Sequence, residues 1–210
     1  MESIVTIHNG DAELGLRERK KSQVRHALIA SALELFRERG FDETSIDDIA
    51  ARANVSRRTF FRYFATKDEV IFVDRRSNLL AFRALLAAAH PGEPLTVGVM
   101  RAWTFIAQHY SDNRDTLLPT QQMIQAHPLL RGRELDYDRE WEQAMVDEIA
   151  RRQSDRPATA GRALVLGGAI MGVARTVFRQ WAHELGGKGD LVGASRNALE
   201  LLLPLLKTVE

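Results

Sequence analysis

From Lys20 onward, apolar residues recur at spacings of three and four, the period of a helix with one apolar face. The first such stripe consists of Val24, Leu28, Ala32, Leu35 and Phe36. Further helical stripes are expected at about 95–110, 114–126, 129–152, 158–185 and 191–207. No segment alternates strictly and then turns on Asn-Gly or Asp-Gly, so no strands are expected. The sequence therefore predicts an all-α fold of about nine helices.

Two of the predicted helices are short and are separated by a turn. Thr44 is expected to cap the first of them. Asn54-Val55-Ser56 forms the turn before the second, with Ser56 as the cap of that helix. The second helix spans Arg57–Tyr63 and directs Phe60 and Phe64 inward, because they lie four positions apart. Two helices of about nine and seven residues joined by a three-residue turn predict a helix-turn-helix.

The chain is expected to divide into three parts. Residues 1–16 show no period and predict a flexible arm. A long helix is expected at 67–89, with Thr66 and Glu69 as a capping box at its start. The sequence His90-Pro91-Gly92-Glu93-Pro94 ends it. The three parts are the arm at 1–16, a three-helix helix-turn-helix domain at 17–66, and a larger helical domain at 67–210.

Composition excludes several classes of protein. The absence of cysteine excludes disulfides, thiolate catalysis and cysteine-ligated zinc. The longest apolar stretch without charge, Ala163–Ala174, has 12 residues, whereas a membrane-spanning helix needs about 20. The N-terminus has no basic segment followed by an apolar run, so no secretory signal is expected. We therefore expect a cytoplasmic protein.

The net charge of +1 conceals two local clusters of basic residues. Ile49–Lys67 contains five basic residues and no acidic one, and Arg17–Arg25 contains five basic residues and one Glu. Binding to a polyanion depends on where charge lies rather than on its total. On a helix-turn-helix these clusters favour DNA, whereas on an ordinary helical hairpin they would form a solvated face.

In a helix-turn-helix, the first residues of the second helix meet base edges in the major groove. The residues on the outward side of this helix are Ser56, Arg57, Arg58, Thr59 and Arg62. Arginine can donate twice to guanine O6 and N7, which provides about 1–3 kcal/mol of discrimination per base. Tyr63 and Lys67 lie at the helix end, where they can hold phosphates. The sequence thus predicts binding to double-stranded DNA.

The segment Phe36–Val70, FRERGFDETSIDDIAARANVSRRTFFRYFATKDEV, closely resembles the DNA-binding head of TetR-family transcriptional regulators. The resemblance implies base-facing side chains at Arg57, Thr59 and Arg62. It implies contacts with the DNA backbone at Ser45, Arg52, Tyr63 and Lys67. Two positions depart from the family pattern: Arg58 stands where Gly or Pro is common, and Phe61 lacks the hydroxyl of the common Tyr.

The same resemblance implies that the larger domain dimerises through its last two helices and holds a small-molecule pocket. Each glycine inside a helix lowers helix stability by about 1 kcal/mol relative to alanine. Close approach of a neighbouring helix, or space for a ligand, offsets this cost. The glycines concerned are Gly167, Gly168 and Gly172. The expected dimer interface consists of Gly168, Gly172, Leu199, Leu202, Leu203 and Leu206. The leucines suit either a partner helix or packing within the same chain.

Ligand sites are mostly apolar with a few polar groups, and flexible methionine adapts to varied ligands. The candidate pocket residues are Met100, Trp103, Ile106, Met123, Trp141, Met145, Met171, Arg175 and Phe178. Met and Trp residues in helices also pack in the hydrophobic core without contacting a ligand. An inward-facing Arg175 needs an anionic partner, which is either a ligand or a protein acid.

A further resemblance points to the ligand class. Its residues are Gln122-Met123-Ile124, His127-Pro128-Leu129-Leu130-Arg131, Glu140-Trp141-Glu142 and Ala144. They are similar to a subgroup of actinobacterial TetR-family regulators with acyl-CoA-like ligands, including those of mycofactocin gene clusters. The expectation is a repressor that binds an inverted-repeat operator as a homodimer and is released by a small hydrophobic or acyl-CoA-like ligand. No cofactor is expected.

Two other classes of protein are alternatives. An architectural DNA-binding protein without ligand control would have a solid C-terminal core and no cavity. A helical-bundle enzyme would need Glu-x-x-His on facing helices, and none of the residues three positions before the six histidines is acidic. Asp136, Asp138 and Glu140, interleaved with arginines, are expected to form a solvated face. Neither enzymatic activity nor a metal site is expected.

Overall fold

The computed structural model describes residues 15–90, 92–152, 159–184, 186–202 and 204. These residues form ten α-helices and one π-helical segment, with no strand among them, which confirms the all-α fold. The chain divides into two compact units, Met1–Val73 and Asp74–Glu210. Residues 1–14 of the expected arm lie outside the described part of the chain.

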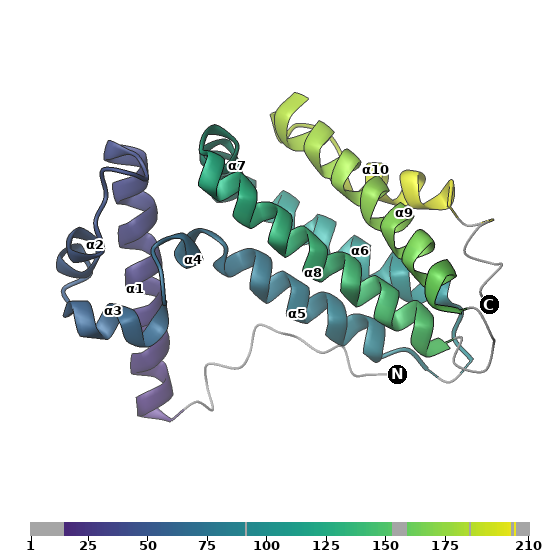
Figure 1. Ribbon diagram of the computed structural model, residues 1–210, viewed down its shortest axis with the longest axis horizontal. Helices are drawn as coiled ribbons and strands as arrows, with labels where there is room; N and C mark the ends of the chain where they lie inside the picture. Colours follow the sequence, from purple (N-terminus) through teal and green to yellow (C-terminus); the bar gives the residue numbers. More distant parts are fainter. Residues whose placement is uncertain (1–14, 91, 153–158, 185, 203, 205–210) are drawn as a thin grey trace. The chain divides into compact units, whose positions relative to one another are not determined.

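The first unit contains four helices (Figure 1): α1 (Leu16–Arg39), α2 (Ile46–Arg52), α3 (Arg57–Tyr63) and α4 (Asp68–Ile71). Gly40 ends α1 with a φ of 88°, a conformation that favours glycine. Helix α2 packs on both α1 and α3, and α4 packs on α1. The core between them includes Leu28, Leu35, Phe36, Ile49, Phe60 and Phe64.

The start of α2 differs from the prediction by one residue. Ser45, not Thr44, caps it: the Ser45 Oγ accepts from the Asp48 amide at 3.1 Å, and the Ser45 amide donates to Asp48 Oδ2 at 3.0 Å. The Thr44 side chain is buried, and its hydroxyl donates to the Gly40 carbonyl at 2.8 Å. The hydrogen bonds from Ser45 lower the pKa of Asp48, so its charge is retained near the positive end of the helix.

The long helix predicted at 67–89 is interrupted. Helix α4 ends at Ile71, Phe72 leaves helical geometry (φ −97°, ψ 8°), and α5 spans Val73–Ala87. Residues 70–73 are all buried, and four consecutive buried residues do not fit a straight helix with one apolar face. The predicted capping box is also wrong, because the Glu69 carboxylate accepts from the Ala65 amide instead.

The second unit is a helical bundle (Figure 1). It consists of α5, α6 (Leu95–Asp112), α7 (Arg114–Ala126), α8 (Pro128–Arg152), α9 (Thr159–Arg179), the π-helical segment η1 (Gln180–Glu184) and α10 (Leu191–Glu200). Helix α8 packs along α9, and α10 packs on α6 and α9. The core contains Phe82, Val99, Ile106, Met145, Ile149 and Ile170. Helix α10 ends at Glu200 and is followed by a turn at Leu201 and Leu202, while residues 203 and 205–207 of the helix predicted at 191–207 lie outside the described residues.

The stretch Gly161–Glu184 is long and apolar enough to cross a membrane by length and composition alone. Ala163, Ile170, Met171 and Trp181 within it are buried against other parts of the unit. One such helix is weak evidence for a membrane span, and 28% of its apolar window is buried inside the unit.

Gly167 allows α8 and α9 to approach each other closely. A Cβ at Gly167 would lie 2.7 Å from Val146 Cγ2 and 3.2 Å from the Val146 backbone nitrogen, whereas a Cβ at Gly172 would meet no described atom within 4 Å. We therefore expect Gly167→Ala to lower the free energy of unfolding by about 1–2 kcal/mol through overpacking. Gly172→Ala is expected to raise it by up to about 1 kcal/mol, because alanine favours helix. Chemical denaturation measures both, and the same sign of change in both variants would contradict this packing.

Candidate functional site

Helix α3 has two distinct faces. Phe60 and Phe64 are buried, as predicted, and Ser56 caps the helix by accepting from the Thr59 amide at 3.1 Å. The opposite face exposes Arg57, Arg58, Phe61 and Arg62. Thr59 and Tyr63, between the faces, are half-buried. The short helix therefore presents three guanidinium groups and one aromatic ring on one surface.

Arg57 contacts two neighbours on this exposed face. Its Nη1 donates to Asp47 Oδ2 of α2 at 2.6 Å, and its guanidinium carbon lies 5.5 Å from the centre of the Phe61 ring. The Arg62 guanidinium lies 5.2 Å from the centre of the Tyr63 ring. Both partners of the Arg57–Asp47 pair are more than half exposed, so the pair is weak and can exchange for another anion.

Two residues predicted to contact the DNA backbone also have partners within the first unit. Arg52 donates to both Glu38 carboxylate oxygens, at 2.6 and 2.8 Å, which lowers the pKa of Glu38 and ties α2 to α1. The Lys67 Nζ donates to the carbonyls of Phe41 and Thr44 at 2.6 and 2.9 Å. It also lies 4.3 Å from the centre of the Phe41 ring. Lys67 thus anchors the loop between α1 and α2.

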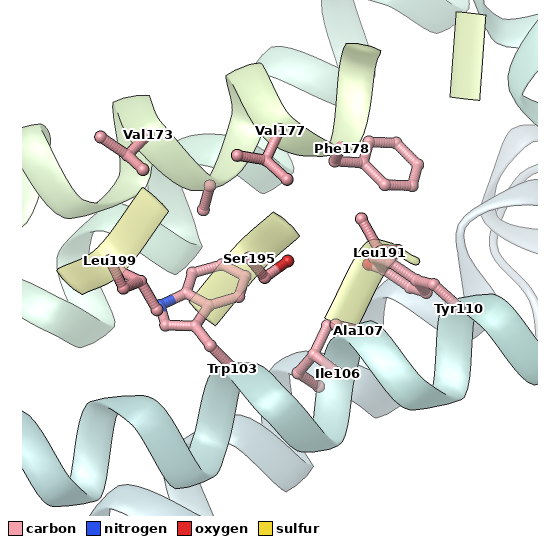
Figure 2. A pocket seen from close by; sticks show the side chains of 11 residues that line it. Trp103, Ile106, Ala107, Tyr110, Val173, Val177, Phe178, Leu191, Ser195 and Leu199 are labelled. Carbon is pink, nitrogen blue, oxygen red and sulfur yellow. The ribbon is translucent and has the colours of Figure 1, made fainter. Parts of the chain in front are cut away.

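A small apolar cavity of about 20 Å³ lies in the second unit between α6, α9 and α10. Figure 2 shows Trp103, Ile106 and Tyr110 of α6 facing Val173, Val177 and Phe178 of α9. Leu191, Ser195 and Leu199 of α10 complete the wall. The Trp103 Nε1 is buried and has no hydrogen-bond partner among the described residues. A buried donor without a partner is costly unless a ligand or water supplies an acceptor.

A second cavity and an open cleft lie next to the apolar cavity, and Phe178 lines all three. The second cavity, of about 50 Å³, shares Trp103, Tyr110, Ala174 and Phe178 with the first, and Trp141 and Met171 add to its wall. Its remaining lining residues, Arg75, Asp138 and Arg175, also line a cleft of about 630 Å³. Four arginines line the cleft: Arg75, Arg131, Arg175 and Arg179. Apolar and aromatic cavities therefore lie next to a cleft lined by arginines.

Arg75, in the first turn of α5, connects that helix to α7 and α8. Its Nη2 donates to Gln121 Oε1 at 2.9 Å and to Glu134, and its Nη1 lies 3.5 Å from Asp138 Oδ1. The buried Gln121 in turn donates to Glu134 at 2.8 Å. Burial raises the pKa of the Asp138 carboxyl, although the nearby Arg75 charge opposes this effect.

The structure brings together six of the nine predicted pocket residues: Trp103, Ile106, Trp141, Met171, Arg175 and Phe178. Arg175 is not simply inward-facing. Its side chain is 43% exposed and lies 3.9 Å from Glu142, so it has a distant acidic partner. Met145 belongs to the fully buried core, Met100 packs against that core, and Met123 lines none of the three cavities.

Sequence reasoning missed Arg75, Tyr110 and Asp138. Asp138 was expected on a solvated face, which holds for exposed Asp136 and Glu140, but the Asp138 side chain is only 18% exposed. The available signal was the four-residue spacing of Glu134, Asp138 and Glu142, which places three acids on one side of α8. Among the described residues, no group of acids and histidines is arranged to hold a metal ion.

Two family models cover most of the chain. Residues 28–72 match the model for bacterial regulatory proteins of the tetR family, and residues 93–207 match the model for the MftR C-terminal domain. The chain belongs to the TetR family. TetR-family proteins are transcriptional regulators, not enzymes; they bind DNA operators and small-molecule effectors and act as dimers.

Individual relatives cover nearly the whole length of this TetR-family chain. It is 31% identical to the HTH-type transcriptional regulator TcmR of Streptomyces glaucescens, over 91% of this chain and 88% of that protein. It is 27% identical to the mycofactocin biosynthesis regulator MftR of Mycobacterium tuberculosis, over 86% and 95% of the two chains. The TetR-family repressor FadR of Thermus thermophilus, solved with lauroyl-CoA, has the same fold, with a TM-score of 0.57, 24% identity, and coverage of 85% and 93%.

The residues expected at the dimer interface of this TetR-family protein lie in different environments. Leu199 is 3% exposed and lines the apolar cavity, so it is not on an open surface, and Leu202 packs against the same core. Leu203 and Leu206 fall outside the described residues. Gly168 and Gly172 are half-buried on α9, and Gly172 lines the cleft. The same helix exposes Leu164 and Val165, at 56% and 70%, which sequence reasoning did not select.

Proposed function

We propose that this chain is a cytoplasmic repressor that binds an inverted-repeat operator as a homodimer and leaves it when a small hydrophobic or acyl-CoA-like ligand binds. The observation that carries ligand control is an apolar cavity, an aromatic cavity and an arginine-lined cleft that lie side by side and share lining residues. An architectural protein without ligand control would have a solid core, so the cavities favour a regulator that binds an effector.

For DNA recognition, α3 enters the major groove with its exposed face toward the bases. Arg57 and Arg62 face bases, together with the Thr59 hydroxyl, while Arg58 and Tyr63 reach phosphates. The surface of α3 supports this assignment, because its arginines are exposed while its phenylalanines at 60 and 64 anchor it to the core. Ser45, Arg52 and Ser56 lie at or near the ends of α2 and α3, where backbone contacts are made.

For homodimer formation, we assign α9 and α10 as the contacting helices. Leu164 and Val165 supply the exposed apolar surface that an interface core needs, beside the small residue Gly168. Two recognition helices related by a two-fold axis then address half-sites about one helical turn apart or more.

For ligand control, an apolar chain or ring system occupies the space beside Trp103 and Phe178, and polar groups lie among the arginines of the cleft. The FadR of Thermus thermophilus was solved with lauroyl-CoA, a ligand that combines these two parts. Helix α5 lines the cleft through Arg75 and follows the first unit directly along the chain. A ligand that prefers the released conformation by a few kcal/mol shifts the population away from DNA.

The test is release of DNA by a defined ligand. Purified protein is titrated onto an operator fragment selected from the genome, and lauroyl-CoA is then added while DNA anisotropy is followed. We expect release from wild type, and Trp103→Ala should weaken the effect of the ligand at least about tenfold without altering DNA affinity in its absence. Leu129→Ala, at an exposed position outside the cavities, is the control. A response to lauroyl-CoA that is equal in both variants would remove Trp103 from the site.

A further inference from the structure

We propose that the ligand of the second unit carries an anionic group next to its apolar body, and that Arg75 receives this group in exchange for Asp138. This inference rests on the ligand control proposed above and names the chemical class of the ligand. A neutral apolar molecule would fill the cavities but would not replace Asp138 at Arg75.

The two Nη atoms of Arg75 are bound unequally. Nη2 is held by Gln121 and Glu134, whereas Nη1 meets Asp138 at 3.5 Å, the outer limit of a hydrogen bond. The Arg75 side chain is only 13% exposed, so its charge is partly removed from water and gains from a closer anion. Because Asp138 lines both the aromatic cavity and the cleft, an anion that displaces it comes from the ligand site.

The balance of charge around the cleft also favours an anion. Its lining contains four arginines but only two acids, Glu134 and Asp138. The Glu134 carboxylate already accepts hydrogen bonds from Arg75, Gln121 and Gln125 through its two oxygens. The other acid, Asp138, meets the Arg75 guanidinium only at 3.5 Å, so it is the more easily displaced of the two.

The walls next to Arg75 suit an apolar body with an acceptor atom. Trp103 and Trp141 stack with ring centres 5.8 Å apart, and Tyr110 and Phe178 lie 5.1 Å apart. The buried Trp103 Nε1, which has no partner in the described part of the chain, provides a donor for a carbonyl or a second acid oxygen. The anion itself has two possible sources, the carboxylate of a free acid or a phosphate of a CoA thioester.

The test compares two fluorescent probes that share an aromatic body. 8-Anilinonaphthalene-1-sulfonate carries a sulfonate, and N-phenyl-1-naphthylamine is its neutral counterpart. Full-length protein without DNA is titrated with each. Wild type is expected to bind the sulfonate at least about tenfold more tightly than the neutral probe, because a charged hydrogen bond is added. Arg75→Gln should abolish this preference, and Asp138→Asn should strengthen sulfonate binding a few-fold by removing the competitor.

Arg139→Gln is the matched control, because it removes a charge from α8 at an exposed residue outside the cavities. Equal binding of the two probes to wild type, or a preference that survives Arg75→Gln, would overturn the proposal. If Arg75→Gln does not fold, as judged by circular dichroism, the test rests on Asp138→Asn. Sulfonate binding to Asp138→Asn that is equal to or weaker than binding to wild type would overturn the proposal.

Competition against the bound sulfonate probe distinguishes the two sources. Displacement by laurate indicates a carboxylate, displacement by lauroyl-CoA alone indicates a phosphate, and displacement by neither would contradict both. Because these assays contain no DNA, they separate the inference from the proposed regulation. Probe binding as expected with no effect of ligand on operator binding would leave the anion site standing and refute ligand control.

Discussion

Lys67→Met is expected to destabilise the first unit by about 2–3 kcal/mol, because hydrogen bonds to charged groups each contribute about 1.5–3 kcal/mol. The Lys67 ammonium group donates to the carbonyls of Phe41, Asp42 and Thr44 at 2.6, 3.3 and 2.9 Å. Methionine preserves the apolar stem but supplies no donor to the three carbonyls. The loop between α1 and α2 should then open more often, which faster amide hydrogen exchange in this loop would reveal.

Hydrogen exchange is the appropriate measurement because all three tryptophans, Trp103, Trp141 and Trp181, lie in the second unit and do not report on the first. Lys21→Met, at an exposed lysine of α1, is the control and should change exchange little. The sequence had predicted that Lys67 holds a phosphate. Unchanged exchange combined with uniformly weaker binding to all DNA would favour that role and contradict the anchor.

Arg57→Ala is expected to cost about 1–3 kcal/mol of operator binding and to relax sequence preference at one base of each half-site. The reason is that Arg57 lies at the start of α3 and is oriented by Asp47 at 2.6 Å and by the Phe61 ring. Titration of the operator and of single-base variants measures both effects.

Asp47→Asn is the variant to compare with Arg57→Ala, and its effect on DNA affinity should have the opposite sign. It removes a carboxylate from the DNA-facing side, so affinity for all DNA should rise a few-fold while discrimination among sequences falls. Unaltered base preference in Arg57→Ala would show that α3 is not placed in the groove as proposed.

The parts of the fold that sequence predicted well are those decided by local chemistry. Helix α3, its Ser56 cap and the inward phenylalanines at 60 and 64 were all correct, because periodicity and capping act over a few residues. The cap of α2 was misplaced because Thr44 and Ser45 are adjacent and both can cap. Tertiary packing decides between them, by turning the Thr44 hydroxyl back to Gly40.

The candidate ligand site was predicted less completely, for a different reason. Met145 and Met171 have the same chemistry, yet one lies in solid core and the other beside a cavity. Arg75 and Asp138 are 63 residues apart, so no local pattern indicates that they meet. Phe72 breaks the long helix because residues 70–73 are all buried, which depends on contacts distant in sequence.

The most direct test of the central claim is selection of genomic fragments by the purified protein, followed by titration of the best fragment and of random DNA at two salt concentrations. A sequence-specific dimer should recover an inverted repeat and bind it at least about a thousandfold more tightly than random DNA. Affinity for both should fall with salt, because arginines and lysines replace counterions on phosphates. Binding that depends on salt but shows no preference for any fragment would contradict the account and favour an architectural protein.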